Sequence, residues 1–368
     1  MTAFNQKWVS PTVIIALISL IYVFGVLLVN KGDPQAFILL GTQFSQSDPN
    51  GSEGYDGQFA YQIALNPAGA APYIDVPAYR YQRILYPLLA RWLALGQAAL
   101  IPWTLIIVNI GAITLGTGAT ERLLLHLRIS RWYALVYGLY GGQLLSLRTD
   151  LNEPLAHAFV QLAMLAWAKE RRWWAVGAFA LAALGKETTL VFLAAYMLYT
   201  LSQRMWGWTL RLGLAAIPFV LYQSFLWSWL GSFGVGSGGA GATPFSPIPL
   251  AGWLAIAGVS VGAFLLISLV VGPMSILPSI AGLWLSLKEV GYQNLHPFVF
   301  CLLLNSVVIL FLPTSTFREP VAMLRLTTGL MAAMLMFGAW RRSRRILNYS
   351  TFWIFTNVLL INGVAGAG

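Results

Sequence analysis

Charged residues are scarce in this sequence, and their scarcity excludes a soluble globular protein. Only 9% of the 368 residues are Asp, Glu, Lys or Arg, while 58% are hydrophobic. A soluble domain carries about 25% charged residues. A bilayer core about 30 Å thick requires about 20 apolar residues per crossing helix, and such stretches recur along the chain. We therefore predict a polytopic membrane protein.

Cysteine and histidine are also rare. The single cysteine, Cys301, lies in an apolar stretch, which excludes a disulfide framework and a cysteine metal cluster. The three histidines, His126, His157 and His296, show no spacing typical of a metal cage, and we expect His157 to be packed inside a helix. The net charge of +10 comes from basic residues dispersed in short clusters, so membrane topology explains it better than nucleic-acid binding.

The apolar stretches predict an all-α transmembrane helix bundle of about 11 spans, forming a single domain over residues 1–368. Residues 11–29 are too long for a signal peptide and no small-residue cleavage site follows, so we expect a retained first helix. Pro273 and Pro278 predict a kink or a split in the long stretch 258–287. The expected spans are residues 11–29, 101–120, 132–147, 154–168, 173–185, 188–202, 210–230, 258–287, 296–312, 321–340 and 347–364.

Short basic connections determine the expected orientation. Segments such as "ERLLLHLRISR" (121–131) and "RRSRR" (341–345) lie between apolar stretches, and the positive-inside rule places them in the cytoplasm. This orientation is consistent only if residues 84–97 do not cross the membrane, so we predict an interfacial or re-entrant helix there. It predicts a multi-pass protein of the cytoplasmic (inner) membrane, with the N-terminus on the cytoplasmic side and the site facing outside. The first extracytoplasmic loop then covers residues 30–83, and a glycine-rich outer loop covers residues 231–249.

The remaining charges gather at the outer face in this orientation. Ionisable residues at membrane depth are costly and usually have a function. In "SEGYDGQFAYQIALNP" (52–67), Asp56 lies between glycines that let a ligand approach closely, and the apolar spacing after it predicts an amphipathic helix lying on the membrane. The outer connections contain the candidate site residues, which are Glu53, Asp56, Arg80, Arg83, Asp150, Glu153, Lys186, Glu187, Arg318 and Arg325.

Several of these segments also have an ordinary structural explanation. The acids of "TDLNEP" (149–154) are typical of a helix N-cap and first turn. The segment "GKETT" (185–189) fits a solvated turn between helices, and Arg80 and Arg83 are suited to anchoring an interfacial helix at lipid headgroups. Arg325 is different, because it lies one to two turns inside its helix and must reach the interface or meet an anion.

Short motifs in these connections resemble the GT-C superfamily of multi-spanning glycosyltransferases, most closely bacterial members that form cell-surface glycopolymers. The matching stretches are "YDGQF", "YRYQRILYPLLARWL", "TDLNEP", "LAALGKETTL" and "FREP…LRLTTGL". The resemblance implies inverting transfer of a sugar from a polyprenyl-phosphate donor to a lipid, glycan or protein acceptor at the extracytoplasmic face. It gives Asp56 the role of general base, with Glu53 as its substitute. The chemistry of the transfer predicts that the other candidates bind substrate, with the basic ones stabilising the phosphate leaving group. For Asp150 and Glu153, binding sugar hydroxyls, holding those cations and serving with Asp56 all remain open. The sequence lacks the paired Asp-x-Asp of many members and their large soluble carboxy-terminal domain. The use of a divalent cation and the type of acceptor are therefore open.

Two other functions remain open from the sequence. A noncatalytic, degenerate GT-C-like subunit of a larger membrane complex would not need the outer charges. A transporter or lipid flippase usually shows an internal repeat and discontinuous helices at the midplane, and no repeat is visible. The expected partners are the polyprenyl-phosphate-linked sugar, membrane lipids and, for a subunit, other membrane proteins; nucleic acid is not expected.

Overall fold

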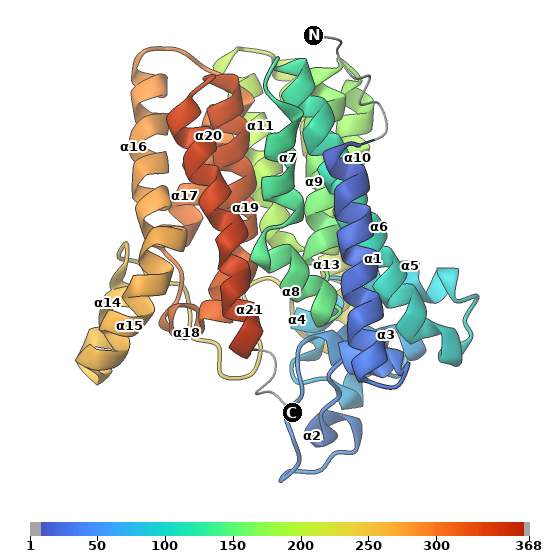
Figure 1. Cartoon of the computed structure of the whole chain (residues 1–368). Helices are drawn as coiled ribbons and strands as arrows, with labels where there is room; N and C mark the ends of the chain where they lie inside the picture. The colour runs from blue at the N-terminus through green and yellow to red at the C-terminus, as the bar shows by residue number, and fades with distance from the viewer. Residues whose placement is uncertain (1–8, 364–368) are drawn as a thin grey trace.

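The computed structural model describes residues 9–363, which form an all-helical bundle (Figure 1). These residues contain α-helices, short 3₁₀ segments and one π-helical turn, and no strand. Segments long and apolar enough to cross a membrane are Pro11–Val29, Ala98–His126, Trp206–Leu230, Val261–Gly291 and Pro320–Trp340. The all-α fold is therefore confirmed for the described residues, and the five long apolar helices support a membrane protein. The larger number of crossings stays a prediction.

The longer helices run between the two ends of the bundle (Figure 1). In Figure 1, α1 runs from the end that carries the N-terminus to the end where the first loop is folded. The α-helices are α1 (Pro11–Val29), α2 (Thr42–Ser45), α3 (Gly57–Leu65), α4 (Pro77–Tyr81), α5 (Leu85–Leu93), α6 (Ile101–His126), α7 (Ala134–Gly138), α8 (Gly141–Arg148), α9 (Glu153–Ala168), α10 (Arg172–Gly185), α11 (Leu190–Ser202), α12 (Trp206–Gly213), α13 (Ile217–Leu230), α14 (Ala251–Val259), α15 (Val261–Val271), α16 (Leu277–Gly291), α17 (Pro297–Leu310), α18 (Thr314–Arg318), α19 (Pro320–Trp340), α20 (Arg344–Ser350) and α21 (Val358–Gly363).

Helix α19 occupies the interior of the bundle. Most of its side chains are buried, because α8, α17 and α20 pack around it. Small residues permit this close packing. Gly329 is one of them, since a Cβ atom there would collide with the Asn305 side chain of α17. The tight packing holds Arg325, one to two turns into the same helix, in a fixed position.

The predicted interruption by proline is confirmed. A π-helical turn at Gly272–Ile276 separates α15 from α16, and Pro273 within it has no N–H to donate. The carbonyl groups of Pro273 and Met274 accept hydrogen bonds from the Tyr349 hydroxyl and the Trp353 indole. The carboxy-terminal aromatic residues therefore stabilise the break.

The first loop folds into short helices at the end of the bundle opposite the N-terminus (Figure 1). The predicted helix after Asp56 is present as α3, and its apolar residues Phe59 and Ile63 are buried with Tyr81 and Leu226. That apolar face is thus covered by protein and is not left open to lipid. Helix α5 forms within residues 84–97 and exposes Trp92, and its location at the membrane interface stays a prediction.

Candidate functional site

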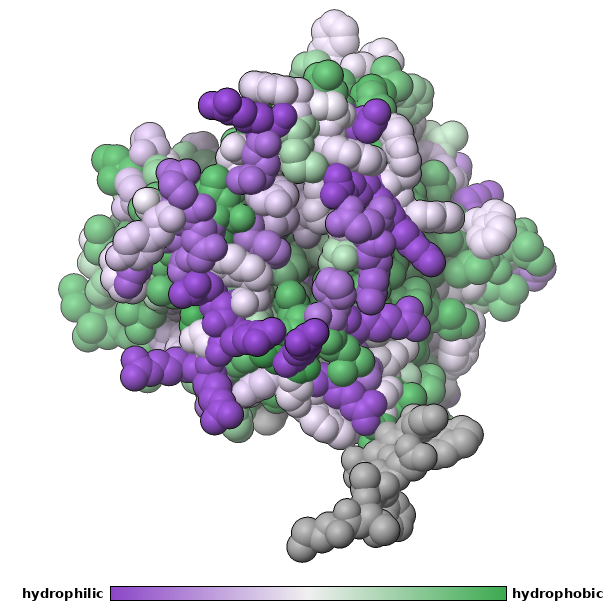
Figure 2. Space-filling view, turned by 90° about the horizontal axis from the view of Figure 1, so that it is seen from above, coloured by the Kyte–Doolittle hydropathy of each residue, from purple (hydrophilic) through white to green (hydrophobic). Residues whose placement is uncertain are grey.

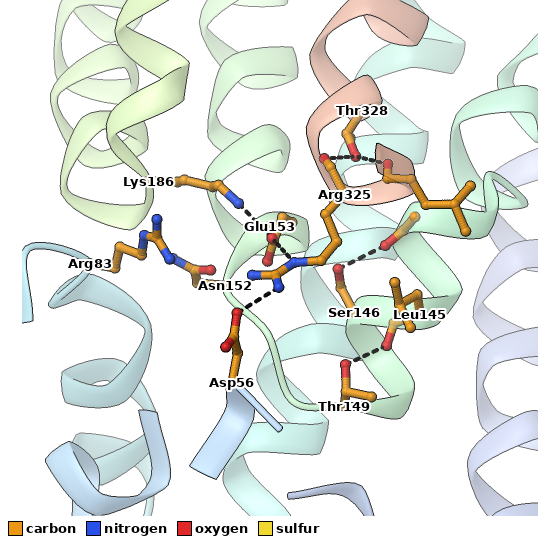
Figure 3. Close-up of polar contacts among 12 residues, drawn as sticks. Asp56, Arg83, Leu145, Ser146, Thr149, Asn152, Glu153, Lys186, Arg325 and Thr328 are labelled. Carbon is orange, nitrogen blue, oxygen red and sulfur yellow. Dashed lines mark hydrogen bonds and ion pairs between the residues drawn. The ribbon is translucent and has the colours of Figure 1, made fainter. Parts of the chain in front are cut away.

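Asp56 lies just before α3 and binds two arginines. Its Oδ2 atom accepts a hydrogen bond of 2.6 Å from Nη1 of Arg325 (Figure 3). Its Oδ1 atom lies 3.0 Å from Nη2 of Arg80. The next residue, Gly57, lets the loop approach Thr149 closely, because a Cβ atom at Gly57 would collide with the Thr149 carbonyl oxygen. The loop can therefore lie against the turn between α8 and α9.

Glu153 extends the network into the bundle. One oxygen, Oε1, accepts hydrogen bonds from Lys186 Nζ at 2.5 Å and from Arg325 Nε at 2.7 Å. Figure 3 shows Arg325 between the two carboxylates, with Lys186 approaching Glu153 from the other side. The Glu153 side chain is completely buried, and its second oxygen has no hydrogen-bond partner among the described residues. Arg325 thus connects the first loop to the interior.

Two bidentate ion pairs flank this network. Arg80 donates to Asp75 at 2.8 and 2.7 Å, and Arg83 donates to Glu187 at 2.9 and 2.7 Å. The guanidinium of Arg83 also lies over the Tyr79 ring, at 4.3 Å from its centroid. Bidentate geometry and stacking fix an arginine more firmly than a single contact does. Both arginines are therefore held in place and are not free anchors for lipid headgroups.

A cavity of about 30 Å³ lies within the site and is lined by Asp56, Arg80, Arg83, Asp150 and Arg325, among others. Asp150 is completely buried and has a left-handed backbone conformation, with φ of 48°. Its Oδ2 atom has no hydrogen-bond partner among the described residues. A cavity of this size holds about one water molecule. A ligand much larger than water can therefore enter this cavity only if side chains of the network move apart.

The site shifts the pKa values of Asp56 and Asp150 in opposite directions. Burial alone would raise the pKa of Asp56, but Arg325 and Arg80 outweigh burial and hold this pKa well below its ordinary value. Burial raises the pKa of Asp150 well above its ordinary value, because only Tyr86 and Arg148 oppose the effect. Burial also lowers the pKa of Lys186 to about 8, although Glu153 counteracts it. Asp56 is thus an anion at neutral pH, whereas burial favours the neutral form of Asp150.

The structure does not bring every candidate residue into the network. Glu53 is exposed, and only its backbone carbonyl, which accepts a hydrogen bond from Gln58, has a role in the loop. Arg318 is exposed at the end of α18 and forms no ion pair with the described residues. Asp75 was not among the predicted site residues, and its position five residues before Arg80 was the only signal for it in the sequence. The other eight candidates lie in the network or in the cavity wall and ion pair beside it.

Histidine takes little part in this chemistry. His157 is buried beside Phe192, as expected, and its Nδ1 atom lies 3.0 Å from the Glu153 carbonyl oxygen. Within the described residues, no group of three His, Cys, Asp or Glu side chains is arranged to hold a metal ion.

The glycine-rich segment 231–249 lies against Asp75 and Arg80. The Ala240 N–H donates to Asp75 at 3.1 Å, so Asp75 binds the segment and Arg80 at once. Thr243 and Ser315 exchange hydrogen bonds of 3.1 and 3.2 Å, which attach the same segment to α18. Gly239 lies so close to Arg80 that a Cβ atom there would be 3.0 Å from its Nη2 atom. The segment therefore bridges two sides of the site.

Comparisons with family models, curated proteins and solved structures find no match to this chain. Its function has to be argued from its own geometry.

Proposed function

We propose that this protein is a GT-C-like inverting glycosyltransferase that moves a sugar from a polyprenyl-phosphate donor to an acceptor at the extracytoplasmic face. One observation carries the proposal: the two oxygens of Asp56 are shared between Arg80 and Arg325 at one end of a membrane helix bundle. A carboxylate beside two guanidiniums combines a proton acceptor with binding groups for a phosphate. The membrane supplies the lipid that carries that phosphate.

The reaction needs a base and a stabilised leaving group. The acceptor oxygen attacks the anomeric carbon while its proton passes to Asp56, and the bond from that carbon to the phosphate oxygen breaks. The electron pair of this bond remains on the phosphate, giving polyprenyl phosphate. Arg80 and Arg325 stabilise the developing negative charge, and a positioned general base contributes about 10² to 10⁴ in rate.

The ion pairs give the arginines a second role in this proposal. While Arg80 and Arg325 bind Asp56, its low pKa makes it a weak base. A phosphate in the site would compete for both guanidiniums, and their withdrawal would raise the basicity of Asp56 only when the donor is bound. Asp75 and Glu153 also accept hydrogen bonds from the Nε atoms of the same two arginines, so the arginines would stay attached during the exchange.

Reconstitution with radiolabelled polyprenyl-phosphate sugars tests the proposal. We expect Asp56→Asn to lose at least 100-fold in transfer rate, the lower end of the range of about 10² to 10⁴ for a general base. Glu53→Gln is the matched control, because it neutralises an exposed acid of the same loop. Full activity of Asp56→Asn would remove Asp56 as the base, and the absence of transfer from every such donor would refute the class of enzyme.

The same geometry also favours a second candidate, a noncatalytic subunit of a membrane complex. Asp56 is fully occupied by arginine contacts, as it would be if the network only fastened the first loop to α19. For a subunit, Asp56→Asn would lower stability and assembly but leave the glycans of the cell unchanged. Stoichiometric recovery of the chain in a purified complex would support this candidate.

A further inference from the structure

A second hollow lies at the opposite end of the bundle from Asp56. It has a volume of about 560 Å³ and lies between the end of α16 and the junction of α19 with α20. Its polar lining includes Lys288, Tyr292, Asn294, Arg341 and Ser343. We call this hollow the α16–α20 groove. Its volume falls within the range of about 300 to 1,000 Å³ that is usual for small-molecule sites.

The groove carries excess positive charge. Its one acid, Glu289, accepts a hydrogen bond of 2.6 Å from Asn294 and lies 3.2 Å from Arg341, so Glu289 neutralises Arg341. Lys288 has no carboxylate within ion-pair distance among the described residues. Three further exposed basic residues lie within four positions of Arg341 in the chain, namely Arg342, Arg344 and Arg345. Figure 2 views this end of the molecule, where hydrophilic side chains cover much of the face.

An apolar surface leads up to these charges. On α16, the exposed side chains of Leu277, Ile280, Trp284 and Leu287 follow helical spacing and end at Lys288. The Lys288 ammonium lies 5.3 Å from the centre of the Trp284 ring. Aromatic rings and basic residues of this kind mark the boundary between hydrocarbon and headgroups in membrane proteins. The helix therefore presents an apolar face, an aromatic boundary and a cationic groove in that order.

We propose that the α16–α20 groove binds the headgroup of an anionic phospholipid whose acyl chains lie along α16. Basic pockets between membrane helices are suited to anionic headgroups. Lys288 binds the phosphate as a point charge, while Asn294 and Ser343 provide polar groups in the lining. The apolar face of α16 selects a lipid over a soluble phosphate. This site is separate from the Asp56 network and does not depend on the transferase activity.

Native mass spectrometry of the purified protein tests the site. The protein is titrated with phosphatidylglycerol, with phosphatidylcholine of the same acyl chains, and with soluble glycerophosphoglycerol. Each basic residue near a membrane surface contributes about a factor of five in binding, so we expect Lys288→Gln to weaken phosphatidylglycerol roughly fivefold and Lys288→Gln with Arg341→Gln roughly thirtyfold. The matched control is Arg171→Gln with Arg204→Gln, which removes two exposed charges at the same end but outside the groove.

The outcomes separate a specific site from a diffuse charge effect. Tight binding of phosphatidylglycerol alone, weakened in the groove variants and unchanged in the control pair, supports the site. Equal binding of phosphatidylcholine, equal binding of the soluble headgroup, or equal loss in the control pair overturns it. If the double variant does not fold, Lys288→Gln decides alone, because its side chain is exposed and without an ion pair among the described residues.

Discussion

Glu153 is the residue whose removal should cost the protein most. Its carboxylate is completely buried between Lys186 and Arg325. The side chains of these two residues are only 4% and 11% exposed, respectively. Glu153→Gln keeps the shape of the side chain but leaves Lys186 without its anionic partner. Breaking a buried ion pair on one side costs about 3 to 5 kcal/mol, because a buried charge remains uncompensated.

A titration with sodium dodecyl sulfate in mixed micelles measures this change as a free energy of unfolding. We expect Glu153→Gln to lose about 3 to 5 kcal/mol, and the exposed Glu53→Gln to stay within about 0.5 kcal/mol of the wild type. The double variant Glu153→Gln with Lys186→Met should recover much of the loss, because it removes the unpaired charge as well. If Glu153→Gln changed stability no more than Glu53→Gln, the buried ion pair would not hold the site together.

Two further predictions concern the turn beside Asp56. Burial raises the pKa of Asp150, so its contribution to stability is present below about pH 4, its unfolded pKa, and is lost as the pH rises toward the folded pKa. Asp150→Asn cannot ionise, so its melting temperature relative to that of the wild type should rise between pH 4.5 and pH 7.5. A difference in melting temperature that stays constant with pH would contradict the raised pKa of Asp150. Gly57→Ala should cost about 1 to 3 kcal/mol, because its Cβ atom would collide with the Thr149 carbonyl oxygen. Gly111→Ala, which meets nothing within 4 Å, should be neutral or stabilising, and equal effects of the two would refute the contact.

Local patterns were enough to predict the helices and several of their breaks. The apolar stretches predicted membrane helices because each one has to satisfy its own backbone hydrogen bonds in lipid. Pro273 predicted an interruption because proline lacks a backbone donor, and the π-helical turn occurs there. The number of crossings could not be settled by the same argument, since α9, α10 and α11 are shorter than a bilayer requires and are packed against other helices.

Sequence alone determined that Asp56, Glu153, Lys186 and Arg325 were unusual, because an ionisable group is costly in so apolar a chain. Only the tertiary structure decided which of them meet. The partner of each charge depends on contacts between segments far apart in the chain, such as residues 56 and 325. The structure left the equally acidic Glu53 outside, and it added Asp75 through a bidentate pair with Arg80. Charge pairing is a property of three-dimensional distance, and the spacing of residues along the chain does not specify it.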